Sequence, residues 1–196
     1  MRIVQRASAL VVVAMVMTCA TVAVGAQPET QRVNAYGAAV KAFRDRVDAY
    51  LAMHKKAADE VPPLKETSDA AKLTAREQAL GEAIRRARAG AKPGEIFGGE
   101  LGAHIRNVIR KDWAKRSAAD KAGLIHDVPP GSLADVNATY PPALPLGTFP
   151  AALLAALPPV PEDLEYRFVG RHLILRDVKA NLIVDVLPNV LPGART

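Results

Sequence analysis

Four histidines are the side chains best suited to metal binding or proton transfer in this 196-residue sequence. They are His54, His104, His126 and His172. No two of them have the spacing that places a ligand pair on one helix face. Glu100 and His104 are four residues apart, and we expect them to be structural or to face solvent. The sequence therefore predicts no metal-ligating residues.

Sequence motifs of the common nucleophilic, metal-dependent and nucleotide-dependent enzymes do not occur. There is no Gly-x-Ser-x-Gly turn, His-Glu-x-x-His helix, phosphate-binding loop or dinucleotide fingerprint. Carboxylate pairs such as Asp45 with Asp48 lie among Lys and Arg, as is typical of solvated helix faces. We predict a protein that is not an enzyme and has no catalytic residue and no cofactor. An activity built from residues dispersed in the sequence would leave no such motif and stays open.

The N-terminal residues 1–26 have the pattern of a secretory signal peptide. Two arginines precede an almost wholly apolar stretch at 7–24, and small residues end it. We expect cleavage before Gln27 and export to the periplasm or out of the cell. Two alternatives stay open, namely retention of the apolar stretch as a membrane anchor and lipidation of Cys19.

Cleavage before Gln27 removes the single cysteine and leaves 24 basic and 20 acidic residues. A mature chain without thiols forms no disulfide and has no zinc-thiolate cluster or cysteine nucleophile. It also contains no predicted transmembrane segment. A modest positive charge on an exported protein favours an envelope protein or an anionic surface as partner over nucleic acid.

A long amphipathic helix is predicted to organise the mature chain. Its apolar stripe repeats at spacings of three and four and consists of Val33, Tyr36, Val40, Phe43, Val47, Tyr50, His54 and Ala57. This stripe makes His54 a packed core or interface residue. Prolines 62 and 63 end the helix near Asp59. A second helix, capped by Thr67, Ser68 or Asp69, is expected to return as an antiparallel hairpin.

A third helix, expected from about Gly99 to Arg116, carries the most basic surface of the chain. The possible interaction surface on it consists of Arg106, Arg110, Lys111 and Trp113. One interpretation is an anionic contact anchored by Trp113. The other is a solvated basic face, with Trp113 packed on the helical hairpin.

Composition divides the chain into four parts. They are the signal peptide at 1–26, a helical domain at 27–127, a proline-rich linker or wrap with a short helix at 128–161, and a β-meander with a tail at 162–196. The predicted fold class is mainly α, with a long antiparallel helical hairpin, further helices and a small C-terminal three-stranded antiparallel β-meander. Gly170 and Asn181 suit the turns of the meander, one face of which must lie on apolar surface.

Four stretches resemble a group of uncharacterised secreted bacterial proteins. Residues 157–171, 173–175 and 181–186 resemble the end of that group, and residues 92–97 resemble its mid-chain signature. More distantly, the strand pattern of the tail is similar to the C-terminal module of the periplasmic nickel/cobalt-homeostasis family. The first resemblance implies no activity, and the second implies a hairpin fold for the tail.

The predicted function is that of a non-enzymatic exported envelope protein acting as a binding, scaffold or accessory module. The alternatives are a periplasmic metal or small-ligand accessory protein and an envelope-stress chaperone. The Leu-Thr-x-x-Gln hallmark of the small helical chaperones is missed by one residue at 73–78, which weakens that alternative. The sequence does not specify the partner, the ligand or the oligomeric state.

Overall fold

The computed structural model describes residues 29–126, 135–140 and 146–192. Within these ranges it has the predicted mainly α fold with a small antiparallel β-meander. Its elements are α1 (Glu29–Asp59), α2 (Ala70–Ala87), α3 (Gly99–Lys115), α4 (Ala118–His126), α5 (Ala151–Ala156), β1 (Leu164–Val169), β2 (His172–Asp177) and β3 (Leu182–Leu187). None of the described helices is both long and apolar enough to cross a membrane. The predicted signal peptide, Cys19 and parts of the wrap and tail lie outside the described residues.

Helix α1 buries one stripe along most of its length. The buried positions are Ala39, Phe43, Val47, Tyr50, His54 and Ala57, followed by Val61 beyond the helix. These spacings of three and four confirm the predicted apolar stripe from Phe43 to Ala57, whereas Tyr36 is 37% exposed and Val40 is only partly buried. The helix ends at Asp59, just before the prolines, as predicted.

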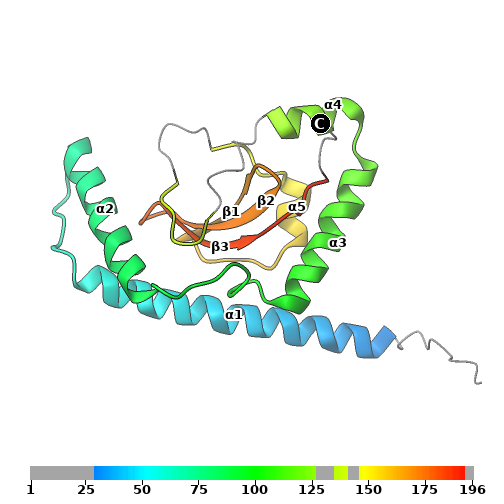
Figure 1. The fold of residues 1–196 in the computed structure, drawn as a ribbon, viewed down its shortest axis with the longest axis horizontal. Coiled ribbons are helices and arrows are strands. Elements are labelled where there is room, and N and C mark those ends of the chain that lie inside the picture. The colour runs from blue at the N-terminus through cyan, green and yellow to red at the C-terminus, as the bar shows by residue number, and fades with distance from the viewer. Residues whose placement is uncertain (1–28, 127–134, 141–145, 193–196) are drawn as a thin grey trace, which may run out of the picture.

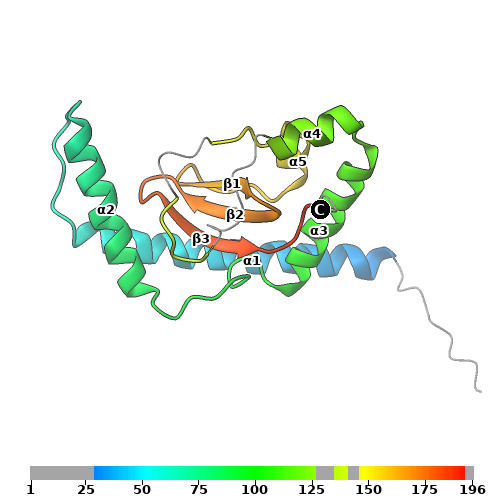
Figure 2. The same cartoon turned by 45° about the horizontal axis from the view of Figure 1, so that its top comes forward.

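Helix α2 meets α1 at a steep angle, so the helical hairpin is splayed (Figures 1 and 2). Asp69 caps α2 by accepting hydrogen bonds from the N–H groups of Ala71 and Lys72. The buried residues of α2 lie in its C-terminal half, whereas Leu73 in the N-terminal half is 48% exposed. The N-terminal half therefore leans away from α1 and leaves space beside it.

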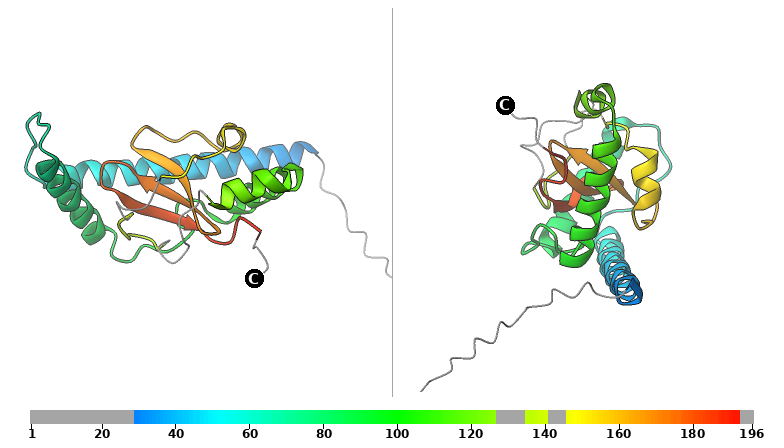
Figure 3. Two further views of the ribbon diagram at one scale, coloured as in Figure 1. Left: turned by 90° about the horizontal axis from the view of Figure 1, so that it is seen from above. Right: turned by 90° about the vertical axis from the view of Figure 1, so that its right-hand side faces the viewer.

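The C-terminal sheet has the order β1-β2-β3, with antiparallel pairing throughout. Gly170 and Asn181 adopt the positive φ angles of 54° and 48° that the tight connections require, as predicted. In Figure 1 the sheet lies along α1, between α2 on the left and α3 on the right. The views in Figure 3 show the same arrangement from above and from the side.

Both faces of the sheet pack against other parts of the chain, although the sequence predicts apolar packing for only one face. The main core joins the helices to one face through residues such as Leu173, Leu175 and Val184. The opposite face packs against residues of the proline-rich wrap, including Tyr140. The wrap also pairs with β3, because the Asn137 N–H donates to the Ile183 carbonyl at 2.8 Å. This described part of the wrap packs as a structural layer of the domain.

Candidate functional site

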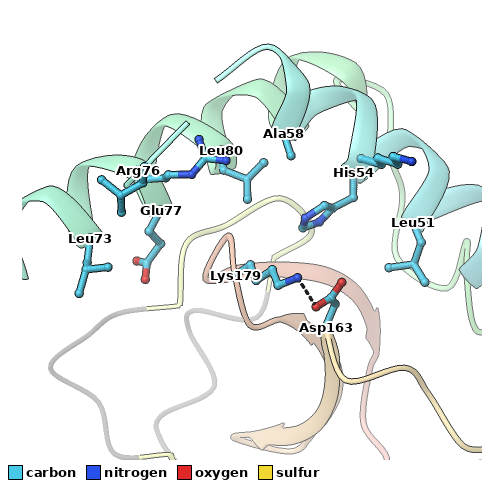
Figure 4. A pocket seen from close by; sticks show the side chains of 11 residues that line it. Leu51, His54, Ala58, Leu73, Arg76, Glu77, Leu80, Asp163 and Lys179 are labelled. Atoms are coloured by element: carbon cyan, nitrogen blue, oxygen red, sulfur yellow. Dashed lines mark ion pairs between the residues drawn. The ribbon is translucent and has the colours of Figure 1, made fainter. Parts of the chain in front are cut away.

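A cavity of about 750 Å³ lies between α1, α2 and one end of the sheet (Figure 4). Its apolar lining consists of Leu51, Ala58, Leu64, Leu73 and Leu80. Its polar lining consists of His54, Lys55, Arg76, Glu77, Asp163 and Lys179. The cavity is therefore amphipathic, with aliphatic side chains from the helices beside charged and imidazole groups.

The tilt of α2 creates this cavity. The guanidinium of Arg76 donates hydrogen bonds to the carbonyls of Val61 and Pro62, at 3.3 and 2.7 Å, and so holds the α1–α2 loop against α2. Leu73 and Leu64 at the rim are 48% and 36% exposed. Exposed aliphatic side chains beside a concave surface are typical of sites that bind an apolar group.

His54 occupies one wall of the cavity and is held from behind by Asp177. The Nδ1 atom of His54 lies 2.6 Å from Oδ2 of Asp177, whose side chain is fully buried at the end of β2. The hydroxyl of Tyr50 donates to the same carboxylate oxygen at 2.6 Å. The backbone N–H of Ala180 donates to the other oxygen at 2.8 Å. Three donors thus fix the carboxylate, and the carboxylate fixes the imidazole.

The electrostatics of this cluster define the donor and the acceptor in each contact. Burial alone would raise the pKa of Asp177, but the hydrogen bonds from His54, Tyr50 and Ala180 outweigh it and lower the pKa. Burial and the adjacent Asp177 raise the pKa of the Tyr50 hydroxyl well above its ordinary value. Asp177 is therefore a carboxylate that only accepts, so Nδ1 of His54 carries a hydrogen.

The second ring nitrogen of His54, Nε2, is the one left for a ligand. Among the described residues no hydrogen bond to this atom is found, and His54 is one of the residues that line the cavity. Figure 4 shows His54 reaching into the cavity from α1, with Lys179 below it and Glu77 directed inward from α2. The Lys179 ammonium pairs with Asp163 at 2.8 Å. An imidazole nitrogen and an ammonium group thus lie beside the aliphatic wall.

The other three histidines lie in different parts of the molecule. The ring of His104 packs against that of Tyr36 with centroids 4.2 Å apart, while Glu100 is exposed. His172 accepts a hydrogen bond from the Asn189 N–H, and burial together with Arg171 lowers its pKa. His126 lies at the end of α4. The described residues contain no group of three or more His, Cys, Asp or Glu side chains able to hold a metal ion.

Arg106, Arg110 and Trp113 lie on one side of α3, and Lys111 of the predicted interaction surface lies on another. Arg106 is half-buried and donates to the carbonyl of Pro188, and Trp113 packs against the main core with Lys121 over its ring. Arg110 and Lys111 are exposed, but successive helix positions point about 100° apart. The structure thus leaves two separate surface cations and two residues with packing contacts.

A second fully buried carboxylate, Asp185 on β3, anchors the loop at residues 92–97. It accepts backbone N–H groups from Gly94, Ile96 and Phe97 at 2.6, 2.8 and 2.7 Å, and a fourth from Val186. Burial raises the pKa of Asp185, although these four donors oppose the shift. Because one strand residue accepts hydrogen bonds from three loop amides, residues 92–97 have a structural role.

Little in the amino-acid sequence predicts the cavity. His54 was predicted as a packed residue of the helix stripe, which its burial confirms, but its partner Asp177 and the wall residue Lys179 were not singled out. A charged residue within or ending an apolar strand, as at Asp177 and Asp185, was the available signal. Comparisons with protein-family models, curated proteins and solved structures find no match to this chain.

Proposed function

We propose that this protein is an exported binding module of the bacterial cell envelope that holds a small amphipathic acid in the cavity between α1, α2 and the sheet. The observation that carries the proposal is the position of His54. Its Nδ1 is fixed by a buried carboxylate, and the residue lines a cavity to which α1 and α2 both contribute aliphatic side chains. This arrangement suits a ligand with one polar end and one apolar end.

The size and charge of the cavity narrow the ligand class. A volume of about 750 Å³ falls within the range of roughly 300–1,000 Å³ that is usual for small-molecule sites. Lys179 is paired with Asp163 and Arg76 donates to loop carbonyls, whereas Lys55 in the same lining has no ion pair among the described residues. An aliphatic carboxylate can pair with Lys55 while its chain packs on the leucine side chains.

Calorimetric titration with octanoate and octylamine, both below their micelle-forming concentrations, tests the proposal. We expect octanoate to bind and octylamine to bind at least tenfold more weakly. The variant Leu73→Glu places a negative charge at the exposed rim and should weaken octanoate binding at least tenfold. Ile125→Glu on α4, at a site that is 42% exposed and outside this cavity, is the matched control.

Two results would contradict the proposal. One is the absence of heat with octanoate under conditions in which the protein is folded. The other is an equal loss of binding in the Leu73 and Ile125 variants, since this would mean that the cavity does not hold the ligand.

A second, independent contact with the envelope is proposed for α3. Arg110 and Lys111 are exposed, and no ion pair or hydrogen bond to either is found among the described residues. We propose that these two cations meet an anionic partner surface, whereas Arg106 and Trp113 support the fold around them. Because neither cation lines the cavity, the two proposals are tested separately.

A further inference from the structure

We infer that the same cavity hydrolyses carboxylic esters of aliphatic acids, with His54 as the general base that activates water. The substrate class rests on the proposed function, since the acid released by hydrolysis is the amphipathic acid that the cavity is proposed to hold. The inference goes beyond binding because it assigns a chemical step to a specific nitrogen atom, Nε2 of His54.

The support for this step is the orientation of the imidazole. A general base must present an acceptor nitrogen to the reacting proton, and a carboxylate on the opposite nitrogen fixes the ring for that task. Here Asp177 holds Nδ1 at 2.6 Å, and Tyr50 and Ala180 hold Asp177 in turn. The fully buried carboxylate cannot rotate away without leaving these donors unpaired.

The reaction balances with water as the only co-reactant. Nε2 of His54 takes a proton from water while the water oxygen forms a bond to the acyl carbon, and the carbonyl electron pair moves onto its oxygen. The tetrahedral intermediate then re-forms the carbonyl, the bond from carbon to the alcohol oxygen breaks, and that oxygen takes the proton from Nε2. The products are a carboxylic acid and an alcohol, and nothing is oxidised or reduced.

The charged groups around His54 favour the negative charge that develops on the carbonyl oxygen. Lys179 lies below His54 in Figure 4, and its ammonium is paired with the half-buried Asp163. An ammonium near a developing oxyanion stabilises the transition state. Arg76 is held against the α1–α2 loop by the loop carbonyls, whereas Lys179 lies below His54 with its ammonium positioned by Asp163, so Lys179 is the cation that we assign to this role.

The remaining titratable neighbours of His54 are distributed among the packed elements. On α1, Tyr50 hydrogen-bonds to Asp177, and Lys55 lines the cavity. On α2, Glu77 is directed into the cavity. Asp177 is the one carboxylate that hydrogen-bonds to the imidazole among the described residues.

Hydrolysis of monooctanoylglycerol by the purified protein, followed by base consumption at constant pH, is the test. We expect octanoate release, and we expect His54→Gln to lower kcat at least 100-fold, in line with the contribution of a general base. His104→Gln on α3 should retain the full rate, since His104 packs on Tyr36 outside the cavity. Circular dichroism of each variant reports whether it is folded.

Tyr50→Phe tests the positioning role of Asp177 without removing the base. Loss of the Tyr50 hydrogen bond leaves more of the carboxylate charge to stabilise the imidazolium. The acid limb of the pH dependence of kcat should therefore move to higher pH, whereas a merely structural contact would leave it in place. This variant keeps the inference testable if His54→Gln does not fold.

The same samples are titrated with octanoate, so that the binding proposal and the catalytic inference can be rejected independently. The catalytic inference is overturned if octanoate binds but ester hydrolysis does not exceed that in buffer. It is also overturned if octanoate binds and folded His54→Gln hydrolyses the ester as fast as the wild type. In both cases the binding proposal stands. No binding and no hydrolysis overturn both. Hydrolysis that depends on His54 and shifts its acid limb in Tyr50→Phe supports the catalytic inference.

Discussion

His54 and Asp177 are separated by 123 residues in the chain, yet Nδ1 of the imidazole lies 2.6 Å from the carboxylate oxygen Oδ2. This contact joins the C-terminal part of α1 to the end of β2. Because Tyr50 donates to the same oxygen, two successive turns of one helix are attached to a single strand residue. The contact holds the helical and sheet parts together and at the same time orients the cavity histidine.

Asp177→Asn is expected to destabilise the protein. The amide oxygen can accept a hydrogen bond, but the charge is lost and the amide hydrogens meet the donors of His54, Tyr50 and Ala180. We expect a loss of about 3 kcal/mol in the free energy of unfolding, the usual scale for removing one member of a buried charged contact. Urea denaturation measures this loss.

Asp45→Asn is the control for Asp177→Asn. Asp45 pairs with Lys41 at 2.7 Å, but both side chains are well exposed, so the change should cost no more than about 0.5 kcal/mol. Equal losses in the two variants would show that the contact at Asp177 contributes nothing particular to stability.

The lowered pKa of Asp177 predicts a pH dependence of stability. A carboxyl group with a lower pKa in the folded state contributes stability that is fully present above its unfolded pKa of about 3.9. This contribution is lost as the pH falls through the still lower folded value. Unfolding free energies measured from pH 5 downward should therefore fall more steeply in the wild type than in Asp177→Asn. Parallel curves would contradict the assignment.

Asp185→Asn is expected to release the loop at residues 92–97 from β3. The asparagine side chain has one acceptor oxygen for the four backbone N–H groups that now meet two carboxylate oxygens. Leaving buried amides unpaired should cost about 1–3 kcal/mol. Hydrogen exchange at the amides of Gly94, Ile96 and Phe97 should accelerate, and unchanged exchange would show that the carboxylate does not hold the loop.

Two glycine-to-alanine changes should alter the free energy of unfolding in opposite directions. Gly98 has φ of 71°, and a Cβ there would lie 2.5 Å from a guanidinium nitrogen of Arg46, so Gly98→Ala should lower the free energy of unfolding by about 1–2 kcal/mol. Gly37 lies inside α1 with open space around it, so Gly37→Ala should raise it by about 0.5–1 kcal/mol. Thermal denaturation measures both changes in stability. If both variants were stabilised, or both destabilised, the prediction would be wrong.

Charge reversal of Arg110 and Lys111 tests the proposed anionic contact of α3. Cosedimentation with phosphatidylcholine vesicles, with and without phosphatidylglycerol, measures the binding. The double change to Glu should abolish binding to the anionic vesicles, whereas reversal of the exposed Lys65 and Arg86 makes the same change in net charge elsewhere. If the two double variants bind alike, net charge alone accounts for the attraction.

Local rules of sequence were enough to predict much of the fold. The apolar period of α1, a cap of α2 among Thr67, Ser68 and Asp69, and the positive φ angles at Gly170 and Asn181 all follow from interactions between residues close in sequence. The last two positions illustrate this well, because a tight connection between adjacent strands requires them whatever surrounds it.

The tilt of α2 and the composition of the cavity depend on contacts that no local pattern encodes. Gly81 approaches the connection between β2 and β3 so closely that a Cβ would lie 3.2 Å from the carbonyl oxygen of Ala180. This close approach places the contact of α2 in its C-terminal half and leaves Leu73 exposed. Most partners of Asp177 and Asp185 come from helix and loop residues far along the chain, so the sequence contains two charged strand residues without indicating what they bind.

The pairing of the wrap with β3 also affects how the molecule behaves at high concentration. An open strand edge offers its N–H and carbonyl groups to a strand of another chain, and sheets join into aggregates in this way. Here Asn137 and Tyr140 donate to the carbonyls of Ile183 and Asn181, and Ile183 donates to Ala138. The wrap therefore covers the N-terminal part of this edge from within its own chain and limits self-association there.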